Sequence, residues 1–102
     1  MSQVILQVTI SGEVHGVGYR AWVRDQAVTY GLEGWVRNRA DGSVEVLFAG
    51  SADIVAQVVA LCRRGPSSAR VANVVNEPAD VNALNLRRAG EAFSVLPTAC
   101  GR

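Results

Sequence analysis

The sequence predicts an α+β fold, in which a mainly antiparallel five-stranded sheet carries two helices on one face. Three observations predict it: apolar residues alternate in several short runs, they recur at helical spacing in two longer segments, and turn residues separate these stretches. The resulting order is β-α-β-β-α-β with a closing strand, which is the ferredoxin-like sandwich. A chain of 102 residues is long enough for one domain, so residues 1–102 are expected to form a single domain.

The first strand and the first helix are expected on either side of a glycine-containing segment. Residues 4–11 alternate between apolar and more polar side chains, which predicts a half-buried strand. Residues 21–30 place apolar side chains at helical spacing, and Gly31 then ends the helix. The positions of this helix that are expected to be buried are Val23, Ala27 and Tyr30.

A hairpin and a second helix are expected in the middle of the chain. Residues 32–39 and 43–49 alternate as two strands, and the turn Ala40-Asp41-Gly42 joins them. The second helix begins at Ser51, whose side chain can cap it, and ends at Arg63-Arg64-Gly65-Pro66. Its expected buried face consists of Ile54, Val58 and Leu61, flanked by Val55, Val59 and Cys62.

The last third of the chain is expected to add two strands, over residues 70–75 and 92–96. The polar segment 77–90 between them is expected to be a mobile loop or an irregular connection. The tail after Pro97 is expected to be frayed.

The composition is typical of a soluble protein and excludes several kinds of site. No apolar run approaches the length of a membrane span and the N-terminus lacks a secretory signal, so we expect a cytoplasmic protein without a membrane partner. The net charge of +1 argues against a nucleic-acid partner. All 10 basic residues are arginine, which excludes a Schiff-base lysine and a phosphate-loop lysine.

Cysteine and histidine are too few for a disulfide framework or a zinc site. Cys62 and Cys100 are expected to be a buried thiol and a tail thiol. His15 is the only histidine, and the acidic residues show no metal-ligand spacing. We therefore expect neither a metal nor a cofactor, and a monomer is the simplest assembly.

The segment from Gly12 to Arg20 reads Gly-Glu-Val-His-Gly-Val-Gly-Tyr-Arg and joins the first strand to the first helix. Its glycines allow the backbone to approach a bound group, and its amides, with the helix start behind them, can bind an anion. The guanidinium of Arg20 adds a planar set of donors that suits phosphate. The candidate phosphate-binding backbone comprises His15, Gly16, Val17, Gly18, Tyr19 and Arg20.

Other interpretations of this loop are weaker. It lacks the Gly-Lys-Ser/Thr ending of a Walker loop. Gly16 to Ala21 matches the dinucleotide pattern Gly-x-Gly-x-x-Gly/Ala, with Asp41 about 20 residues further on. However, Asp41 falls in the predicted hairpin turn, and the chain is too short for a doubly wound sheet. Taken alone, Gly16 and Gly18 are equally compatible with a plain tight turn.

A second candidate segment runs from Gly34 to Val44 and reads Gly-Trp-Val-Arg-Asn-Arg-Ala-Asp-Gly-Ser-Val. Asn38 shares the strand parity of Val36, so its side chain should not simply face water. Its amide can orient a water molecule through the carbonyl oxygen and donate through the nitrogen. Taken alone, an asparagine at this position is more often a turn residue.

Together the two segments resemble the motifs of the acylphosphatase family. Residues 12–20 match its glycine-x-valine-x-glycine-valine loop ending in aromatic-arginine, and residues 34–44 match its glycine-aromatic-small-x-asparagine motif with the following glycine and valine. The resemblance continues through Gly65-Pro66 and Ala69-Arg70-Val71 to Phe93-Ser94-Val95, so it covers nearly the whole chain. The fold that the resemblance implies is the one expected above.

The resemblance implies a hydrolase that cleaves the carboxyl–phosphate bond of small acyl phosphates to carboxylate and inorganic phosphate. It implies that Arg20 binds the phosphate and that Asn38 positions the attacking water. Because the leaving group is a carboxylate, positioning and charge stabilisation can suffice without a metal, a lysine or a nucleophile. A non-catalytic phosphate-binding or interaction module on the same fold is the alternative.

The chain departs from the family pattern at two places. His15 stands where the family usually has glutamine. A histidine facing the pocket would add a group that titrates near neutral pH, and a position at the rim of the loop is the simpler expectation. The last strand continues as Val95-Leu96-Pro97-Thr98, whereas in many members it ends in an aromatic residue.

Overall fold

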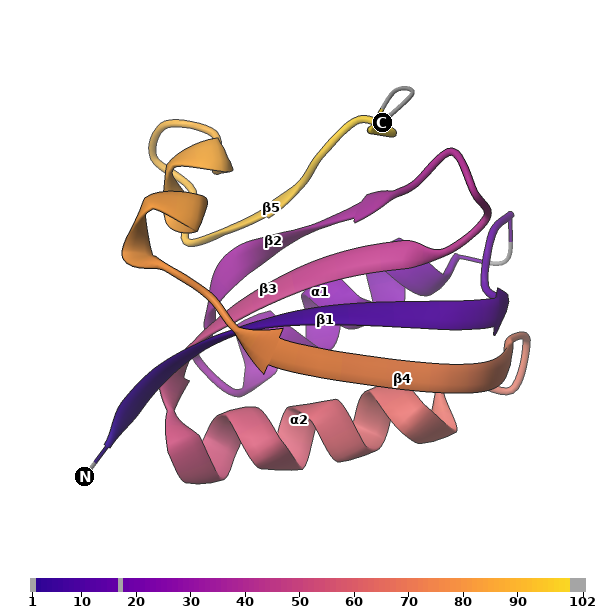
Figure 1. Ribbon diagram of the computed structural model, residues 1–102, viewed down its shortest axis with the longest axis horizontal. Coiled ribbons are helices and arrows are strands. Elements are labelled where there is room, and N and C mark those ends of the chain that lie inside the picture. Colours follow the sequence, from indigo (N-terminus) through magenta and orange to yellow (C-terminus); the bar gives the residue numbers. More distant parts are fainter. Residues whose placement is uncertain (1, 17, 100–102) are drawn as a thin grey trace.

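The structure, a computed structural model, describes residues 2–16 and 18–99 (Figure 1). Its strands are β1 (Gln3–Glu13), β2 (Glu33–Asn38), β3 (Val44–Ser51), β4 (Arg70–Pro78) and β5 (Phe93–Val95). Its helices are α1 (Tyr19–Thr29), α2 (Ala52–Arg64) and the short 3₁₀ helix η1 (Val81–Leu86). The strands form one five-stranded sheet in the order β4-β1-β3-β2-β5. Only β5 runs parallel to its neighbour β2, so the predicted α+β, ferredoxin-like arrangement is confirmed.

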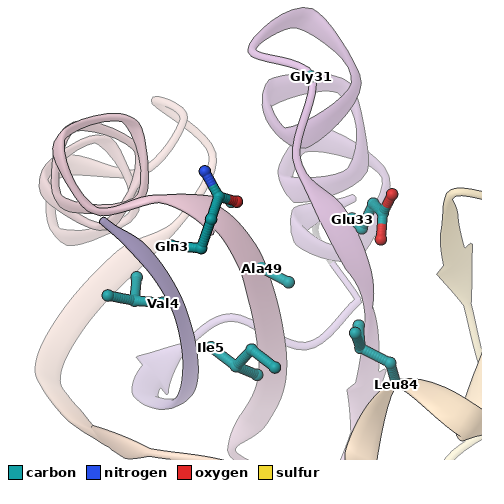
Figure 2. Close-up of a pocket in the computed structure, with 8 residues that line it drawn as sticks. Gln3, Val4, Ile5, Gly31, Glu33, Ala49 and Leu84 are labelled. Atoms are coloured by element: carbon teal, nitrogen blue, oxygen red, sulfur yellow. The ribbon is translucent and has the colours of Figure 1, made fainter. Parts of the chain in front are cut away.

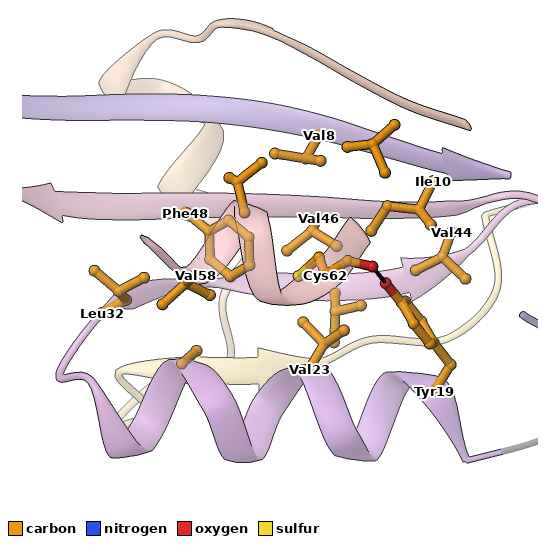
Figure 3. Packing of buried hydrophobic residues seen from close by; sticks show 14 of the residues in the cluster. Val8, Ile10, Tyr19, Val23, Leu32, Val44, Val46, Phe48, Val58 and Cys62 are labelled. Atoms are coloured by element: carbon orange, nitrogen blue, oxygen red, sulfur yellow. Dashed lines mark hydrogen bonds between the residues drawn. The ribbon is translucent and has the colours of Figure 1, made fainter. Parts of the chain in front are cut away.

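The main core lies between the sheet and the two long helices, which cover the same face (Figures 1 and 3). Alternate residues of β1 and β3 point into it because successive side chains of a strand face opposite sides. They are Val8 and Ile10 of β1 and Val44, Val46 and Phe48 of β3. The alternation seen in the sequence therefore identified correctly which side of each strand faces the main core.

The predicted buried face of α1 is correct at two of its three positions, Val23 and Ala27. In α1 the buried residues are Tyr19, Val23 and Ala27, while Tyr30 is only partly buried. The predicted start at residue 21 was late, because Tyr19 already belongs to the helix and reaches into the core.

In α2 the predicted cap and end are confirmed. The hydroxyl of Ser51 accepts a hydrogen bond from the amide of Ile54 at 3.4 Å, and the helix ends at Gly65. The predicted centre of its buried face was wrong, since Ile54 and Leu61 are only partly buried. The buried residues are Val58, which was expected at the centre, and the three positions that were expected to flank it: Val55, Val59 and Cys62.

A second, smaller core covers the opposite face of the sheet. Trp35 and Leu47 meet Leu84 of η1 and Leu96 there, and the indole nitrogen of Trp35 donates to the carbonyl of Ala83 at 2.8 Å. The segment 77–90 is therefore not a mobile loop: it completes β4 and then forms η1, which packs onto the sheet.

The described part of the C-terminal tail continues along β2. The amide of Leu96 donates to the carbonyl of Val36 at 2.8 Å, and the amide of Ala99 donates to the carbonyl of Asn38 at 2.9 Å. These two bonds pair the tail with β2 as far as Ala99. Cys100 lies outside the described residues.

No helix among the described residues is long and apolar enough to cross a membrane.

Candidate active site

A hollow of about 180 Å³ lies where the end of β1, the start of α1 and the end of β2 meet. Its lining consists of Val14, Gly16, Gly18, Tyr19, Arg20, Ala21, Asn38 and Val95. The structure thus brings Arg20 and Asn38 into one pocket, although they stand on different elements. Val17, which the sequence assigned to the phosphate loop, lies outside the described residues.

The two described glycines of the loop give it its shape. Gly16 and Gly18 have φ angles of 70° and 78°, in the left-handed region that other residues adopt only with strain. A β-carbon added at either position would meet no atom within 4 Å, so the glycines are required by the backbone conformation and not by lack of space.

Gly18 is also the residue that precedes α1. In the described part of the chain no side chain caps this helix, and its first turn contains no acidic residue. The first amides of a helix have no partner within it, and the helix dipole makes this end positive. The loop and the helix start therefore offer backbone donors and partial positive charge to an anion in the pocket.

Arg20 is the second residue of α1, and its side chain is partly buried at the pocket. Within residues 2–16 and 18–99, four other arginines form ion pairs but Arg20 forms none. Glu13, the carboxylate of the segment from Gly12 to Arg20, pairs instead with Arg70 at 3.7 Å, and both side chains are exposed. The positive charge of Arg20 is thus not compensated by a described side chain.

Asn38 is the last residue of β2 and lies opposite Val44 in β3. Its backbone carbonyl is fixed by the amide of Ala99. Its side-chain oxygen Oδ1 is buried and has no hydrogen-bond partner among the described residues. Buried polar atoms in proteins are almost always hydrogen-bonded, so an exception beside a pocket points to a role in binding.

The side chain of His15 does not line the pocket. Its Nε2 atom lies 2.8 Å from the carbonyl oxygen of Ser43, in the turn between β2 and β3. Position 15 is exposed, as the rim location predicted from the sequence requires. No sequence signal could have revealed this contact, because its acceptor is a backbone atom on another element.

Sequence reasoning also missed three apolar residues of the pocket wall: Val14, Ala21 and Val95. Val95 reaches the site because β5 runs parallel to β2, with Val95 opposite Val36. The predicted fifth strand was the available signal, but its register against β2 could not be derived from periodicity.

The dinucleotide interpretation of the loop finds no support in the position of Asp41. Its carboxylate accepts hydrogen bonds from the hydroxyl of Ser43 at 2.6 Å and from the amide of Ser43 at 2.9 Å. These bonds, the hydroxyl first, lower the pKa of Asp41. The carboxylate thus braces the hairpin turn.

A larger hollow of about 290 Å³ lies at the opposite end of the sheet (Figure 2). It is lined by Gln3, Val4, Ile5, Gly31, Glu33, Ala49, Gly50 and Leu84. Its one charged residue is Glu33, whose carboxylate pairs with Arg87 at 3.3 Å. None of the residues in this lining is positively charged, so the lining cannot pair with an anion. The larger volume alone therefore does not make this hollow the phosphate site.

In the described part of the chain, no three histidine, cysteine, aspartate or glutamate side chains form a group that could hold a metal ion. The pocket chemistry consists of backbone amides, one guanidinium, one carboxamide and an apolar wall. Such a set can hold an anion and orient a neutral nucleophile beside it.

Comparison with known proteins agrees with this chemistry. The family model described as acylphosphatase matches residues 6–87. A protein of Bradyrhizobium diazoefficiens named acylphosphatase is 67% identical over 98 residues, which are 96% of this chain and 99% of that protein. An acylphosphatase of Rhodopseudomonas palustris is 62% identical over the same shares of the two chains.

Among solved structures, an acylphosphatase from Coxiella burnetii superimposes with a TM-score of 0.79 at 33% sequence identity. The match covers 92% of this chain and 93% of that one.

Proposed function

This chain belongs to the acylphosphatase family and is an enzyme that hydrolyses acyl phosphates; we propose that Arg20 and Asn38 carry this reaction. The substrate is a small-molecule acyl phosphate, and the products are a carboxylate and inorganic phosphate. The proposed reaction uses no metal, no cofactor and no covalent intermediate. Residues 1–102 act as one acylphosphatase domain.

The phosphate is bound by the loop side of the pocket. The guanidinium of Arg20 donates hydrogen bonds to two phosphate oxygens, and the backbone amides of residues 15–20 donate hydrogen bonds to the phosphate oxygens from the loop side. The open N-terminus of α1 and the absence of an ion pair at Arg20 among the described residues support this role. Because charge on the equatorial oxygens persists through phosphoryl transfer, these donors also stabilise the transition state.

The water is held by the other side of the pocket. The Oδ1 atom of Asn38 accepts a hydrogen bond from the water and aims its oxygen at phosphorus, opposite the acyl oxygen. As the new P–O bond forms, the bond from phosphorus to the acyl oxygen breaks and its electron pair leaves with the carboxylate. The proton of the water passes to a phosphate oxygen, so no protein base is needed.

One observation carries the proposal above the others: Arg20, which forms no ion pair with a described residue, borders the same hollow as Asn38, whose buried Oδ1 has no hydrogen-bond partner among the described residues. A fold that needed this buried carboxamide oxygen for stability would have bonded it. The assignment of both roles follows the family motifs that residues 12–20 and 34–44 match.

The test is phosphate release from benzoyl phosphate in the presence of a chelator, comparing wild type with Asn38→Ala. We expect the wild type to be active and Asn38→Ala to lose about 10²-fold in kcat while inorganic phosphate inhibits both equally, since only the water is misplaced. Asn73→Ala, which changes an exposed asparagine on β4, is the matched control.

Three outcomes would contradict the proposal. Equal loss of phosphate binding in Asn38→Ala would place Asn38 among the phosphate ligands. Wild-type activity that disappears with the chelator would show a metal requirement. Phosphate binding without turnover by the wild type would favour the alternative, a non-catalytic binding module.

We also propose that the enzyme works as a monomer in the cytoplasm and does not bind nucleic acid. A monomer is the simplest assembly for one compact domain, and Cys62 is a free buried thiol, which is compatible with a reducing compartment. The net charge of +1 offers little attraction to a polyanion. Gel filtration at assay concentration, cell fractionation and a salt-dependent RNA-binding assay test the three statements.

A further inference from the structure

We propose that His15 is a positioning residue, which holds the phosphate-binding loop in register with the hairpin that carries Asn38. His15 does this through a 2.8 Å hydrogen bond from its Nε2 atom to the carbonyl oxygen of Ser43. This inference rests on the proposed function, because the proposed function assigns the phosphate to the loop and the water to the hairpin.

The contact fixes the role of the imidazole nitrogen. A carbonyl oxygen only accepts, so Nε2 must carry the proton and donate it. The neutral ring with its proton on Nε2 and the charged ring both satisfy this bond. Nε2 is therefore a donor to the hairpin and not a proton acceptor for the water.

The turn that receives this bond is braced by hydrogen bonds of its own. The carbonyl of Ser43 also accepts from the amide of Arg39 at 2.8 Å, and the amide of Gly42 donates to the carbonyl of Arg39 at 3.1 Å. Asp41 closes the turn from inside through its two bonds to Ser43. Asn38 directly precedes Arg39, so a contact at Ser43 reaches the water-holding residue through a braced turn.

The loop needs such a contact because the strand ladder ends before it. The pairing of β1 with β3 stops at Ile10 and Val44, while β1 continues beside β4 as far as Glu13. Beyond the last pair with β3, the bond between His15 and Ser43 joins the loop to the hairpin. This contact couples the two halves that the reaction must align.

The predicted consequence is a selective loss of turnover. All proposed phosphate ligands belong to the loop and the start of α1, so the phosphate should bind whether or not the hairpin is in register. The in-line position of the water depends on the distance between the two halves, and small misplacements of reacting groups strongly reduce rates. Loss of the His15 contact should therefore lower kcat and leave phosphate affinity unchanged.

The test compares three substitutions of His15. In His15→Gln the amide nitrogen lies as many bonds from the α-carbon as Nε2 of histidine, so it can donate to Ser43. His15→Asn keeps the amide but is one methylene shorter, and His15→Leu has no donor. We expect His15→Gln to keep kcat within about twofold, and the other two to lose about tenfold with an unchanged inhibition constant for phosphate.

A double-mutant cycle with Asn38→Ala decides whether His15 acts through the hairpin. When Asn38 no longer holds the water, His15→Leu should change kcat by less than about twofold. Full additivity of the two effects would overturn the proposal, as would wild-type kcat in His15→Leu or failure of His15→Gln to retain activity. Thermal unfolding of each variant confirms that it is folded.

Two further results separate this inference from the proposed function. Normal kcat in Asn38→Ala overturns the proposed function and this inference with it, whereas an impaired Asn38→Ala beside a normal His15→Leu overturns this inference alone.

Discussion

The hydroxyl of Tyr19, the residue next to Arg20, donates a 2.8 Å hydrogen bond to the backbone carbonyl of Cys62 in the last turn of α2 (Figure 3). Within a helix this carbonyl would accept from the amide four residues on, but that residue is Pro66, which has no N–H. Tyr19 thus satisfies an acceptor that α2 cannot satisfy itself. The bond ties the start of α1, where we propose that the phosphate binds, to the end of the other helix.

We expect Tyr19→Phe to lower the free energy of unfolding by about 1–2 kcal/mol, because it leaves the buried carbonyl of Cys62 without a donor. For a chain of this size, that loss lowers the melting temperature by roughly 4–8 °C per kcal/mol. Urea denaturation measures it, and Tyr30→Phe, a partly buried tyrosine of the same helix region, is the control. Equal stability of the two variants would show that the Tyr19 hydroxyl contributes nothing.

Stability should also fall in alkaline solution because of Cys62. Burial raises the pKa of this thiol from its ordinary value of 9.0 to about 12. Between these values the unfolded chain releases the proton and the folded chain keeps it, so the stabilisation is complete below pH 9.0 and is lost as pH rises toward 12. Burial shifts the pKa of Tyr19 upward too, which adds to the loss at higher pH.

The measurement is the free energy of unfolding against pH, in a Cys100→Ser background. Replacing Cys62 by alanine should make the decline between about pH 9 and 11 shallower by up to about 1.4 kcal/mol per pH unit, the value for one proton. An unchanged slope would show that the thiol titrates alike in both states. At pH 8 the native thiol should resist a thiol reagent until the protein unfolds.

Much of the fold could be predicted because strand and helix periodicities are local properties of the sequence. The alternation in β1 and β3 identified their buried sides, and Ser51 and Gly65 marked the ends of α2. The role of segment 77–90 could not be predicted, because the burial of Leu84 depends on Trp35 in a distant strand.

The candidate site, like the fold, could be predicted from the sequence only in part. Motifs specify side chains, so the sequence could single out Arg20 and Asn38 as candidates, and the structure places both at one hollow. The bonds from His15 to Ser43 and from Ala99 to Asn38 end on backbone carbonyls, which leave no trace in residue identity. What the sequence misses is therefore the alignment of the two halves of the site and not their chemistry.

We expect Arg20→Lys to lose about 10²-fold in kcat/KM for benzoyl phosphate, although the charge is retained, because lysine lacks the planar pair of donors. The inhibition constant of inorganic phosphate should rise as well, since Arg20 is the proposed direct ligand of the phosphate. The matched control is Arg24→Lys in the next turn of α1, where the side chain is exposed and pairs with Asp25 at 3.6 Å. Wild-type kinetics in Arg20→Lys would refute the phosphate-binding role.

Arg37→Met should destabilise the protein by about 2–3 kcal/mol, because Glu45 would become a nearly buried carboxylate without its cation. Glu45 accepts from Nε of Arg37 at 2.8 Å and from the amide of Gln7, and its side chain is 9% exposed. Adding Glu45→Gln should recover part of the loss, as urea denaturation would show. Arg70→Met, which breaks the exposed pair with Glu13, should leave stability unchanged.

The last prediction concerns the C-terminal segment, whose Ala99 donates its amide hydrogen to the carbonyl of Asn38. Ala99→Pro removes this donor, whereas Ala99→Ser retains it, so the two variants differ in the hydrogen bond that holds the end of β2. If the bond fixes the orientation of Asn38, Ala99→Pro should lower kcat by about tenfold with unchanged inhibition by phosphate, and Ala99→Ser should match the wild type. Benzoyl phosphate hydrolysis under saturating substrate measures this difference. Wild-type kcat in both variants would mean that pairing with β3 alone orients Asn38. An equal loss of kcat in both variants would assign the effect to the side chain at position 99.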